Sequence, residues 1–116
     1  MPHSAPKLLQ DIRKASEKIQ RYSAGRSLVD YAADDFLRSA VERQFEIIGE
    51  ALLRLTKVDV SLTAQITDCR RIIDFRNALV HGYDAVNDQI VWDAVQHHLP
   101  VLQHEVAALL TSLGMP

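Results

Sequence analysis

Several features that would assign a protein to a specialised class are missing from this sequence. Cysteine occurs only once, as Cys69, which excludes a disulfide framework within the chain and fits a reducing compartment. No apolar run approaches the roughly 18 residues that cross a membrane. The stretch from Met1 to Ser4 lacks the apolar core of a secretory signal peptide. We therefore expect a cytoplasmic protein with no membrane association.

The sequence motifs of common cofactor- and metal-dependent enzymes are also missing. There is no glycine-rich phosphate loop, no G-x-S-x-G nucleophile elbow, no H-E-x-x-H zinc motif and no cysteine cluster. The formal net charge is −2 at pH 7, so the chain as a whole does not attract nucleic acid. Any contact with RNA must therefore be local. No cofactor is predicted.

Helical periodicity extends along most of the chain, and no segment shows the alternation of a strand. The length suits one domain, which we assign to residues 1–116. We predict an all-α bundle of four main helices with one or two short extra helices. The main helices are expected at about 6–23, 34–57, 69–80 and from Asn87 or Asp88 onward. Short helices are expected after a capping box at Ser27 and Asp30, and as one turn capped by Ser61 that reaches Ile66.

The predicted helix over 34–57 combines an apolar stripe with a charged face. The stripe consists of Leu37, Val41, Ile48, Ala51, Leu52 and Leu55. Arg43, Glu46, Glu50 and Arg54 recur on the other side, and the simplest interpretation is a solvated face supported by a Glu50–Arg54 ion pair. The alternative is that Glu46 or Glu50 neutralises a cation on another helix. Gly49 favours this alternative weakly, because a helical glycine allows a second helix to approach closely.

The predicted helix over 69–80, with Thr67 as its expected cap, carries an arginine on its apolar face. Arg76 lies in the middle of the stripe formed by Cys69, Ile72, Ile73, Leu79 and Val80. A guanidinium keeps its charge and is costly to bury unpaired, so Arg76 needs a carboxylate, backbone carbonyls, a subunit interface or an anionic ligand.

Along a straight helix, His81 would point about 140° away from Arg76. We therefore expect the helix to stop near Val80, with Gly82 in a left-handed turn that lets His81 and Tyr83 turn back towards the arginine. The alternative is a salt bridge and a helix cap without chemistry.

The last predicted helix carries three histidines and a proline. Its apolar face is expected to contain Val91, Ala94, Val95, Val101, Leu102, Val106 and Leu109. Pro100 lies on the opposite side, where it should bend the helix. His98 falls within the apolar stripe and is interpreted as a hydrogen-bonded core histidine. His97 and His104 share the polar side, but two imidazoles without a third ligand do not make a metal site, so no metal is predicted.

Three separated segments resemble one family. Residues 75–83, Phe-Arg-Asn-Ala-Leu-Val-His-Gly-Tyr, resemble the Arg-Asn…His-x-Tyr signature of HepT-like proteins in the HEPN superfamily. Residues 43–51 are similar to the long helix of that family, and residues 90–93 and 99–100 are similar to its last helix. The resemblance implies a HEPN-type bundle and a metal-independent ribonuclease. Such proteins are typically toxins of toxin–antitoxin pairs, and they act as homodimers with both motifs lining one cleft.

The resemblance also implies partners. The substrate would be an RNA such as tRNA or mRNA. The antitoxin would be an MntA-type minimal nucleotidyltransferase, which silences the toxin by transferring AMP to the tyrosine of the motif, here Tyr83. AMP at that position would add bulk and a negative phosphate next to Arg76, where the RNA backbone would otherwise lie.

Residue roles follow from the resemblance and from the chemistry of each side chain. Arg76 is assigned to phosphate binding and charge stabilisation, because its planar fork of donors matches phosphate oxygens. His81 is assigned to proton transfer, because it titrates near the working pH. One histidine cannot be base and acid in the same step, so the second role falls to Tyr83, water or His81 of a second copy. Asn77 is expected to hydrogen-bond the backbone or orient His81.

Arg70 and Arg71 are candidates for secondary RNA-binding contacts, with a solvated face as the alternative. Two rival functions also remain. The first is a non-catalytic nucleotide- or partner-binding subunit of a nucleotidyltransferase, in which Arg76 holds a phosphate or an interface carboxylate and His81 only caps the helix. The second is a structural helical dimer in which Arg76 pairs with Glu46 or Glu50. In that case Arg76→Met would cost little stability.

Overall fold

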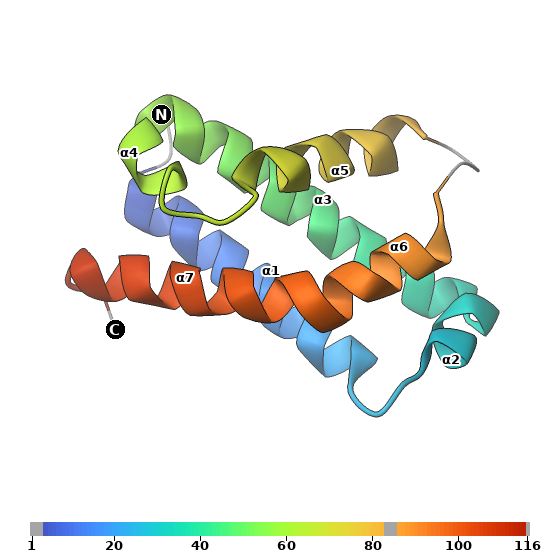
Figure 1. The fold of residues 1–116 in the computed structure, drawn as a ribbon. Coiled ribbons are helices and arrows are strands. Elements are labelled where there is room, and N and C mark those ends of the chain that lie inside the picture. The colour runs from blue at the N-terminus through green and yellow to red at the C-terminus, as the bar shows by residue number, and fades with distance from the viewer. Residues whose placement is uncertain (1–3, 83–85, 116) are drawn as a thin grey trace.

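The computed structural model describes residues 4–82 and 86–115, and every regular element in these ranges is a helix. The predicted all-α bundle is therefore confirmed (Figure 1). Tyr83, the expected AMP acceptor, lies outside the described residues. In the described part of the chain, no helix is both long enough and apolar enough to cross a bilayer. The elements are α1 (Ala5–Ser23), α2 (Leu28–Ala33), α3 (Asp35–Val58), α4 (Val60–Thr63), α5 (Cys69–His81), α6 (Asp88–Asp93), the π-helical segment η2 (Ala94–His98) and α7 (Leu99–Ser112).

Local capping explains where the first two helices begin. The Ser4 hydroxyl accepts a hydrogen bond from the backbone N–H of Lys7 at the start of α1, and Pro6 occupies the first turn. At α2, the Ser27 hydroxyl accepts from the backbone N–H of Asp30, whose carboxylate accepts from the N–H of Ser27. Hydrogen bonding of the Asp30 carboxylate with the backbone N–H and then the side chain of Ser27 lowers the pKa of Asp30. The predicted capping box is confirmed.

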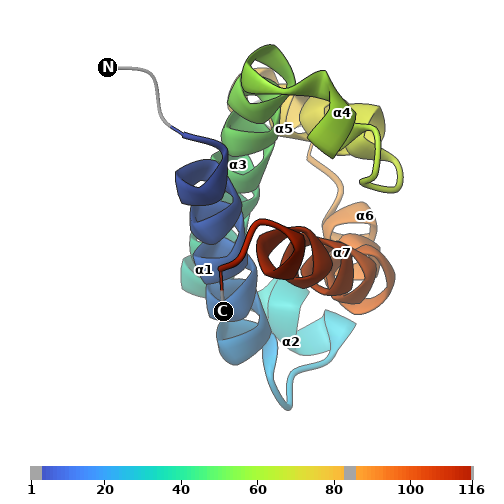
Figure 2. The ribbon, with the colours of Figure 1, turned by 90° about the vertical axis from the view of Figure 1, so that its left-hand side faces the viewer.

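The long helix α3 lies between α1 and α5, and α7 lies against α1 (Figures 1 and 2). The six side chains of the apolar stripe predicted for α3 are all buried, and so is Phe45, which the prediction omitted. Phe45 meets Phe75 of α5 edge to face, with ring centroids 5.3 Å apart. The long helix thus joins the two sides of the core and carries α5 on its surface.

The connection between α3 and α5 differs from the prediction. Asp59 rather than Ser61 caps α4, because its carboxylate accepts from the backbone N–H of Ser61, and α4 ends at Thr63 rather than reaching Ile66. Thr67 does not cap α5. Its backbone N–H and hydroxyl instead donate to the Glu105 carboxylate at 2.9 and 2.7 Å, a tertiary contact with α7 that sequence spacing does not reveal.

The C-terminal helix contains a π-helical segment that the prediction missed. In η2 the N–H of Leu99 donates to the carbonyl of Ala94, five residues back, and Pro100 follows in the first turn of α7. The extra residue in this turn shifts the helical register. Consequently Leu99 is buried, whereas Val101, predicted to be in the core, is 44% exposed. Asn87, one of the two residues at which the last helix was expected to begin, caps α6 through its side-chain oxygen.

Candidate functional site

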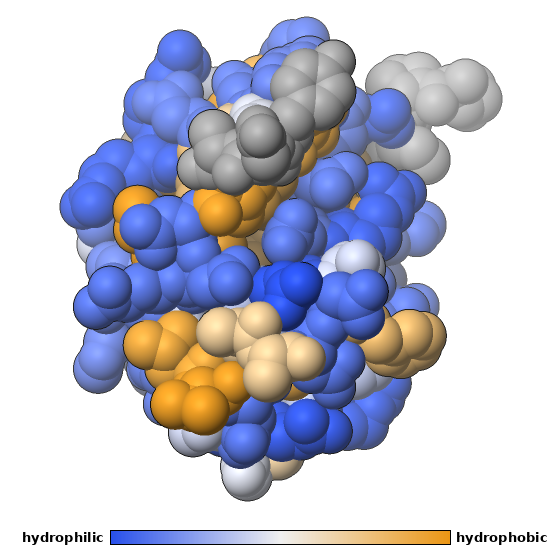
Figure 3. Space-filling model, turned by 90° about the vertical axis from the view of Figure 1, so that its right-hand side faces the viewer, coloured by the Kyte–Doolittle hydropathy of each residue, from blue (hydrophilic) through white to orange (hydrophobic). Residues whose placement is uncertain are grey.

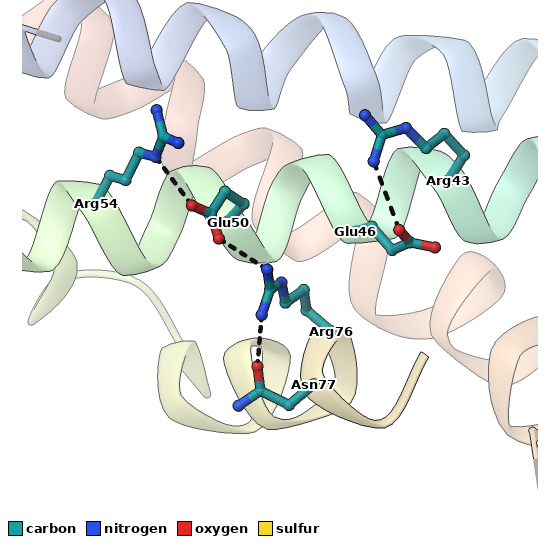
Figure 4. A network of polar contacts seen from close by, with 6 residues as sticks. All are labelled: Arg43, Glu46, Glu50, Arg54, Arg76 and Asn77. Atoms are coloured by element: carbon teal, nitrogen blue, oxygen red, sulfur yellow. Dashed lines mark hydrogen bonds and ion pairs between the residues drawn. The ribbon is translucent and has the colours of Figure 1, made fainter. Parts of the chain in front are cut away.

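Arg76 lies on α5 facing α3, and its guanidinium is held from two sides. The Nη2 atom lies 3.0 Å from Oε2 of Glu50, and Nη1 donates to Oδ1 of Asn77 at 2.9 Å (Figure 4). The Nε–H is buried and has no hydrogen-bond partner among the described residues. The Arg76 side chain remains 23% exposed. The arginine is therefore oriented by the protein and still reaches the surface.

Gly49 permits this arrangement. A Cβ atom added there would lie 2.1 Å from Cβ and 2.6 Å from Cγ of Arg76, far inside van der Waals contact. Only glycine on α3 lets α5 come close enough for Arg76 to reach Glu50. The prediction that Gly49 marks a close helix approach is confirmed.

Glu50 is shared between two arginines. Its Oε1 accepts from Nε of Arg54 at 3.0 Å, while its Oε2 contacts Arg76 (Figure 4). The predicted Glu50–Arg54 pair and the alternative, a pair with a cation of another helix, therefore both occur. Glu46 does not contact Arg76; its Oε1 lies 3.5 Å from Nη1 of Arg43, one turn away on α3.

These side chains surround a surface hollow of about 240 Å³. Its floor is α3, and its walls are the first half of α1 and the second half of α5. Val80, predicted to be in the core, is 39% exposed and lines the hollow beside Arg76. The lining residues are Leu8, Asp11, Arg43, Glu46, Ile47, Glu50, Ala51, Arg54, Arg76 and Val80.

His81 is the last residue of α5 and is exposed. The helix ends near Val80, as predicted, but Gly82 has φ −83° rather than a left-handed conformation, so the predicted left-handed turn was wrong. Glycine is needed at 82 for space, because a Cβ atom would lie 2.4 Å from the carbonyl oxygen of Ala78. Since His81 is still part of the helix, its side chain points about 140° away from that of Arg76. Among the described residues, no hydrogen bond or ion pair joins the two side chains.

The other predicted residues of α5 have different positions. Asn77 contacts Arg76 rather than the backbone or His81. Arg70 and Arg71 are 81% and 75% exposed and form ion pairs with Asp74 and Asp68 on their own helix or beside it. Neither of them lines the hollow around Arg76.

A larger cavity of about 560 Å³ lies on the opposite side of α5, facing α6, η2 and α7. Its lining includes the aromatic rings of Phe45 and Phe75 as well as Arg71 and His98. Figure 3 shows hydrophobic side chains grouped between hydrophilic ones on one face of the molecule. Because neither Arg76 nor His81 lines this cavity, its larger volume does not make it the candidate site.

The histidines of the last helix do not form a metal centre. His98, predicted to be buried, is 49% exposed, and its Nε2 lies 3.4 Å from Oδ2 of Asp93. His97 contacts the same carboxylate at 3.8 Å. Within residues 4–82 and 86–115, no three His, Cys, Asp or Glu side chains are grouped to hold a metal ion. Burial raises the pKa of the Cys69 thiol, which therefore stays protonated at neutral pH.

A family model described as Ribonuclease HepT-like matches residues 12–109, which include α3, α5 and all of the Arg76 contacts. The chain belongs to this family. As a HepT-like protein, it is 30% identical over 103 residues to a protein of Caldanaerobacter subterraneus subsp. tengcongensis that is named as a candidate RNase, a match covering 89% of this chain and 88% of that protein. It is also 30% identical over 103 residues to the "Probable ribonuclease HepT" of Thermococcus cleftensis, covering 89% and 93% respectively. No solved structure matches the chain significantly.

Proposed function

We propose that this HepT-like chain is a metal-independent endoribonuclease in which Arg76 binds the scissile phosphate and His81 transfers a proton. Family membership supports the ribonuclease activity. The observation that carries the residue assignment is the setting of Arg76. A guanidinium fixed by Glu50 and Asn77, yet still partly exposed in a hollow, is prepared to receive an anion.

The reaction requires three events at one phosphate. The 2′-oxygen attacks phosphorus and loses its proton to a base, the negative charge on the phosphorane is stabilised, and the 5′-oxygen leaves with a proton from an acid. These steps form the 2′-oxygen–phosphorus bond and break the bond to the 5′-oxygen, and they leave a cyclic phosphate. Arg76 supplies the charge stabilisation, and an imidazole such as that of His81 supplies a proton donor or acceptor without a metal.

A second copy of the chain would complete the site. Within one copy, His81 and Arg76 point in directions about 140° apart around α5. A homodimer that brings the ends of two α5 helices together would place His81 of each copy near Arg76 of the other. The exposed Val80 between the two residues offers apolar contact area for such an interface.

The control of this activity is also part of the proposal. An MntA-type nucleotidyltransferase antitoxin would transfer AMP to Tyr83, which follows α5 in the sequence. The added phosphate would compete with RNA for Arg76. If this is right, Tyr83→Phe preserves RNA cleavage and abolishes inhibition by the cognate antitoxin with ATP. A Phe variant that is still inhibited would contradict it.

The first test is cleavage of total tRNA and mRNA in EDTA by protein purified without any nucleotidyltransferase and checked by mass for added AMP. We expect cleavage by the wild type and at least a 100-fold loss in Arg76→Ala and His81→Ala, about the effect of removing a charge-stabilising donor or a proton-transfer group. Urea unfolding of each variant must show that it is folded. No cleavage by folded, unmodified wild-type protein would favour the nucleotide- or partner-binding subunit.

The Glu50–Arg76 pair also supports the purely structural alternative, so Arg76→Met is needed as a separate test. If Arg76 is only structural, the apolar replacement leaves both cleavage and stability nearly unchanged. If Arg76 binds phosphate, the same variant folds and loses cleavage. The two measurements on one variant separate the alternatives.

A further inference from the structure

The hollow around Arg76 contains two more arginines, both on α3. Arg43 and Arg54 are eleven positions apart, which places them within about 20° of each other around the helix axis and about 16 Å apart along it. Arg76 reaches the same face of α3 between them, at Glu50 (Figure 4). The Arg76 side chain thus reaches α3 from α5 between the positions of Arg43 and Arg54 on the long helix.

The charge of this face differs from that of the whole chain. Of the residues that line the hollow, Arg43, Arg54 and Arg76 contribute three cations, and Asp11, Glu46 and Glu50 contribute three carboxylates. Glu46 and Glu50 are paired with these arginines, and Asp11 is paired with Lys7 of α1. The hollow is therefore formally neutral, or carries one positive charge when Lys7 is counted, in a chain whose formal net charge is −2. RNA affinity depends on the number of phosphates that are neutralised, so one arginine alone would hold a strand weakly.

Both flanking arginines keep donors for a ligand. Among the contacts of the described residues, Arg54 donates to Glu50 through Nε, and Arg43 approaches Glu46 through Nη1 at 3.5 Å. Their side chains are 52% and 67% exposed. A guanidinium has five N–H donors, so each can bind a phosphate while its carboxylate partner holds it in place.

We infer that Arg43 and Arg54 bind RNA phosphates on either side of the phosphate held by Arg76, so that the strand runs along α3. The inference rests on the proposed ribonuclease function. It replaces Arg70 and Arg71 as the secondary RNA contacts, because those residues lie outside the hollow. Glu50 positions Arg54 and Arg76 together, which sets the spacing between two neighbouring phosphate contacts.

The binding test uses a 12-nucleotide RNA with 2′-O-methyl groups, which block the attacking oxygen and prevent cleavage. Its affinity is measured by fluorescence anisotropy between 50 and 300 mM NaCl. We expect Arg43→Gln and Arg54→Gln each to weaken binding roughly 3-fold and to reduce the slope of log K against log salt by about 0.7. The Lys variants should retain the slope, since they keep the charge. Arg26→Gln, which removes an exposed arginine between α1 and α2, should bind like the wild type.

A cleavage test locates the two contacts relative to Arg76. A dinucleotide carries only the scissile phosphate, so Arg43→Gln and Arg54→Gln should each lower kcat/KM more on a cleavable 12-mer than on the dinucleotide. If the wild type cleaves but the salt slope changes only in Arg70→Gln or Arg71→Gln, the inference is wrong and the proposed function stands. If the folded wild type neither binds nor cleaves RNA, both are wrong.

Discussion

Replacing Gly49 by alanine tests the close contact between α3 and α5 on which the site depends. The new Cβ would lie 2.1 Å from Cβ and 3.5 Å from Cα of Arg76. Carbon atoms in contact are about 3.5–4 Å apart, so α5 must move away by about 1.5 Å. A flexible side-chain end could rotate aside, but the Cβ of Arg76 is attached to the backbone and cannot.

Two opposing effects determine the size of the change in stability. Alanine is better than glycine inside a helix by about 1 kcal/mol. Overpacking in a well-packed contact costs about 1–3 kcal/mol, and this contact is unusually short. We therefore expect Gly49→Ala to lower the free energy of unfolding by about 1–2 kcal/mol. The shift also separates Arg76 from Glu50, so RNA cleavage should fall about 10- to 100-fold, as expected for a misplacement of this size.

The assay is urea unfolding at pH 7 together with RNA cleavage at a temperature where the variant is folded. Ser39, an exposed position on the same helix, provides the control. The difference between Ser39→Gly and Ser39→Ala measures the helix propensity of α3 without a tertiary contact. If Gly49→Ala raises the free energy of unfolding by as much as Ser39→Ala exceeds Ser39→Gly, and the variant still cleaves RNA, the close contact does not position Arg76.

Two further predictions concern contacts outside the hollow. Burial, with the nearby carboxylates of Asp88 and Glu46, raises the pKa of Glu42, against an opposing effect of Arg38. The folded state therefore binds this proton more tightly, and stability is lost as the pH rises above about 4.5. Glu42→Gln should raise the urea midpoint at pH 7 but not at pH 4; an equal gain at both would contradict this. Glu105→Ala removes both hydrogen bonds from Thr67 and should lower the free energy of unfolding by about 1 kcal/mol. An unchanged urea midpoint would show that this link between α7 and the segment before α5 is not stabilising.

Much of the fold could be predicted because its causes are local. The apolar stripe of α3, the capping box at Ser27 and the Asn87 cap depend on residues within a few positions of each other. The sequence also showed that Arg76 needs a counter-charge, since a guanidinium on an apolar helix face keeps its charge and is costly to bury unpaired. Thr67 was misassigned for the opposite reason: its partner, Glu105, lies 38 positions away.

The register of the last helix could not be read from periodicity. A regular helix places His98 and Val101 near the core, but the π-helical turn before Pro100 adds one residue. Pro100 has no N–H to donate to the carbonyl four residues before it. The residue before it, Leu99, donates its N–H to the carbonyl of Ala94, five residues back, which is the hydrogen bond of a π-helix. The shift exposes His98 and Val101 and buries Leu99.

The sequence determined that Arg76 requires a partner and that α3 carries two candidates, Glu46 and Glu50, on one face. It did not determine which of them is used, because residues four positions apart on a helix lie on the same side. The tertiary structure decided this at Gly49, where the absent side chain lets α5 cross α3 one residue from Glu50. Glu46, one turn before Glu50 on α3, pairs with Arg43 instead, because Arg43 lies only three residues away on the same helix.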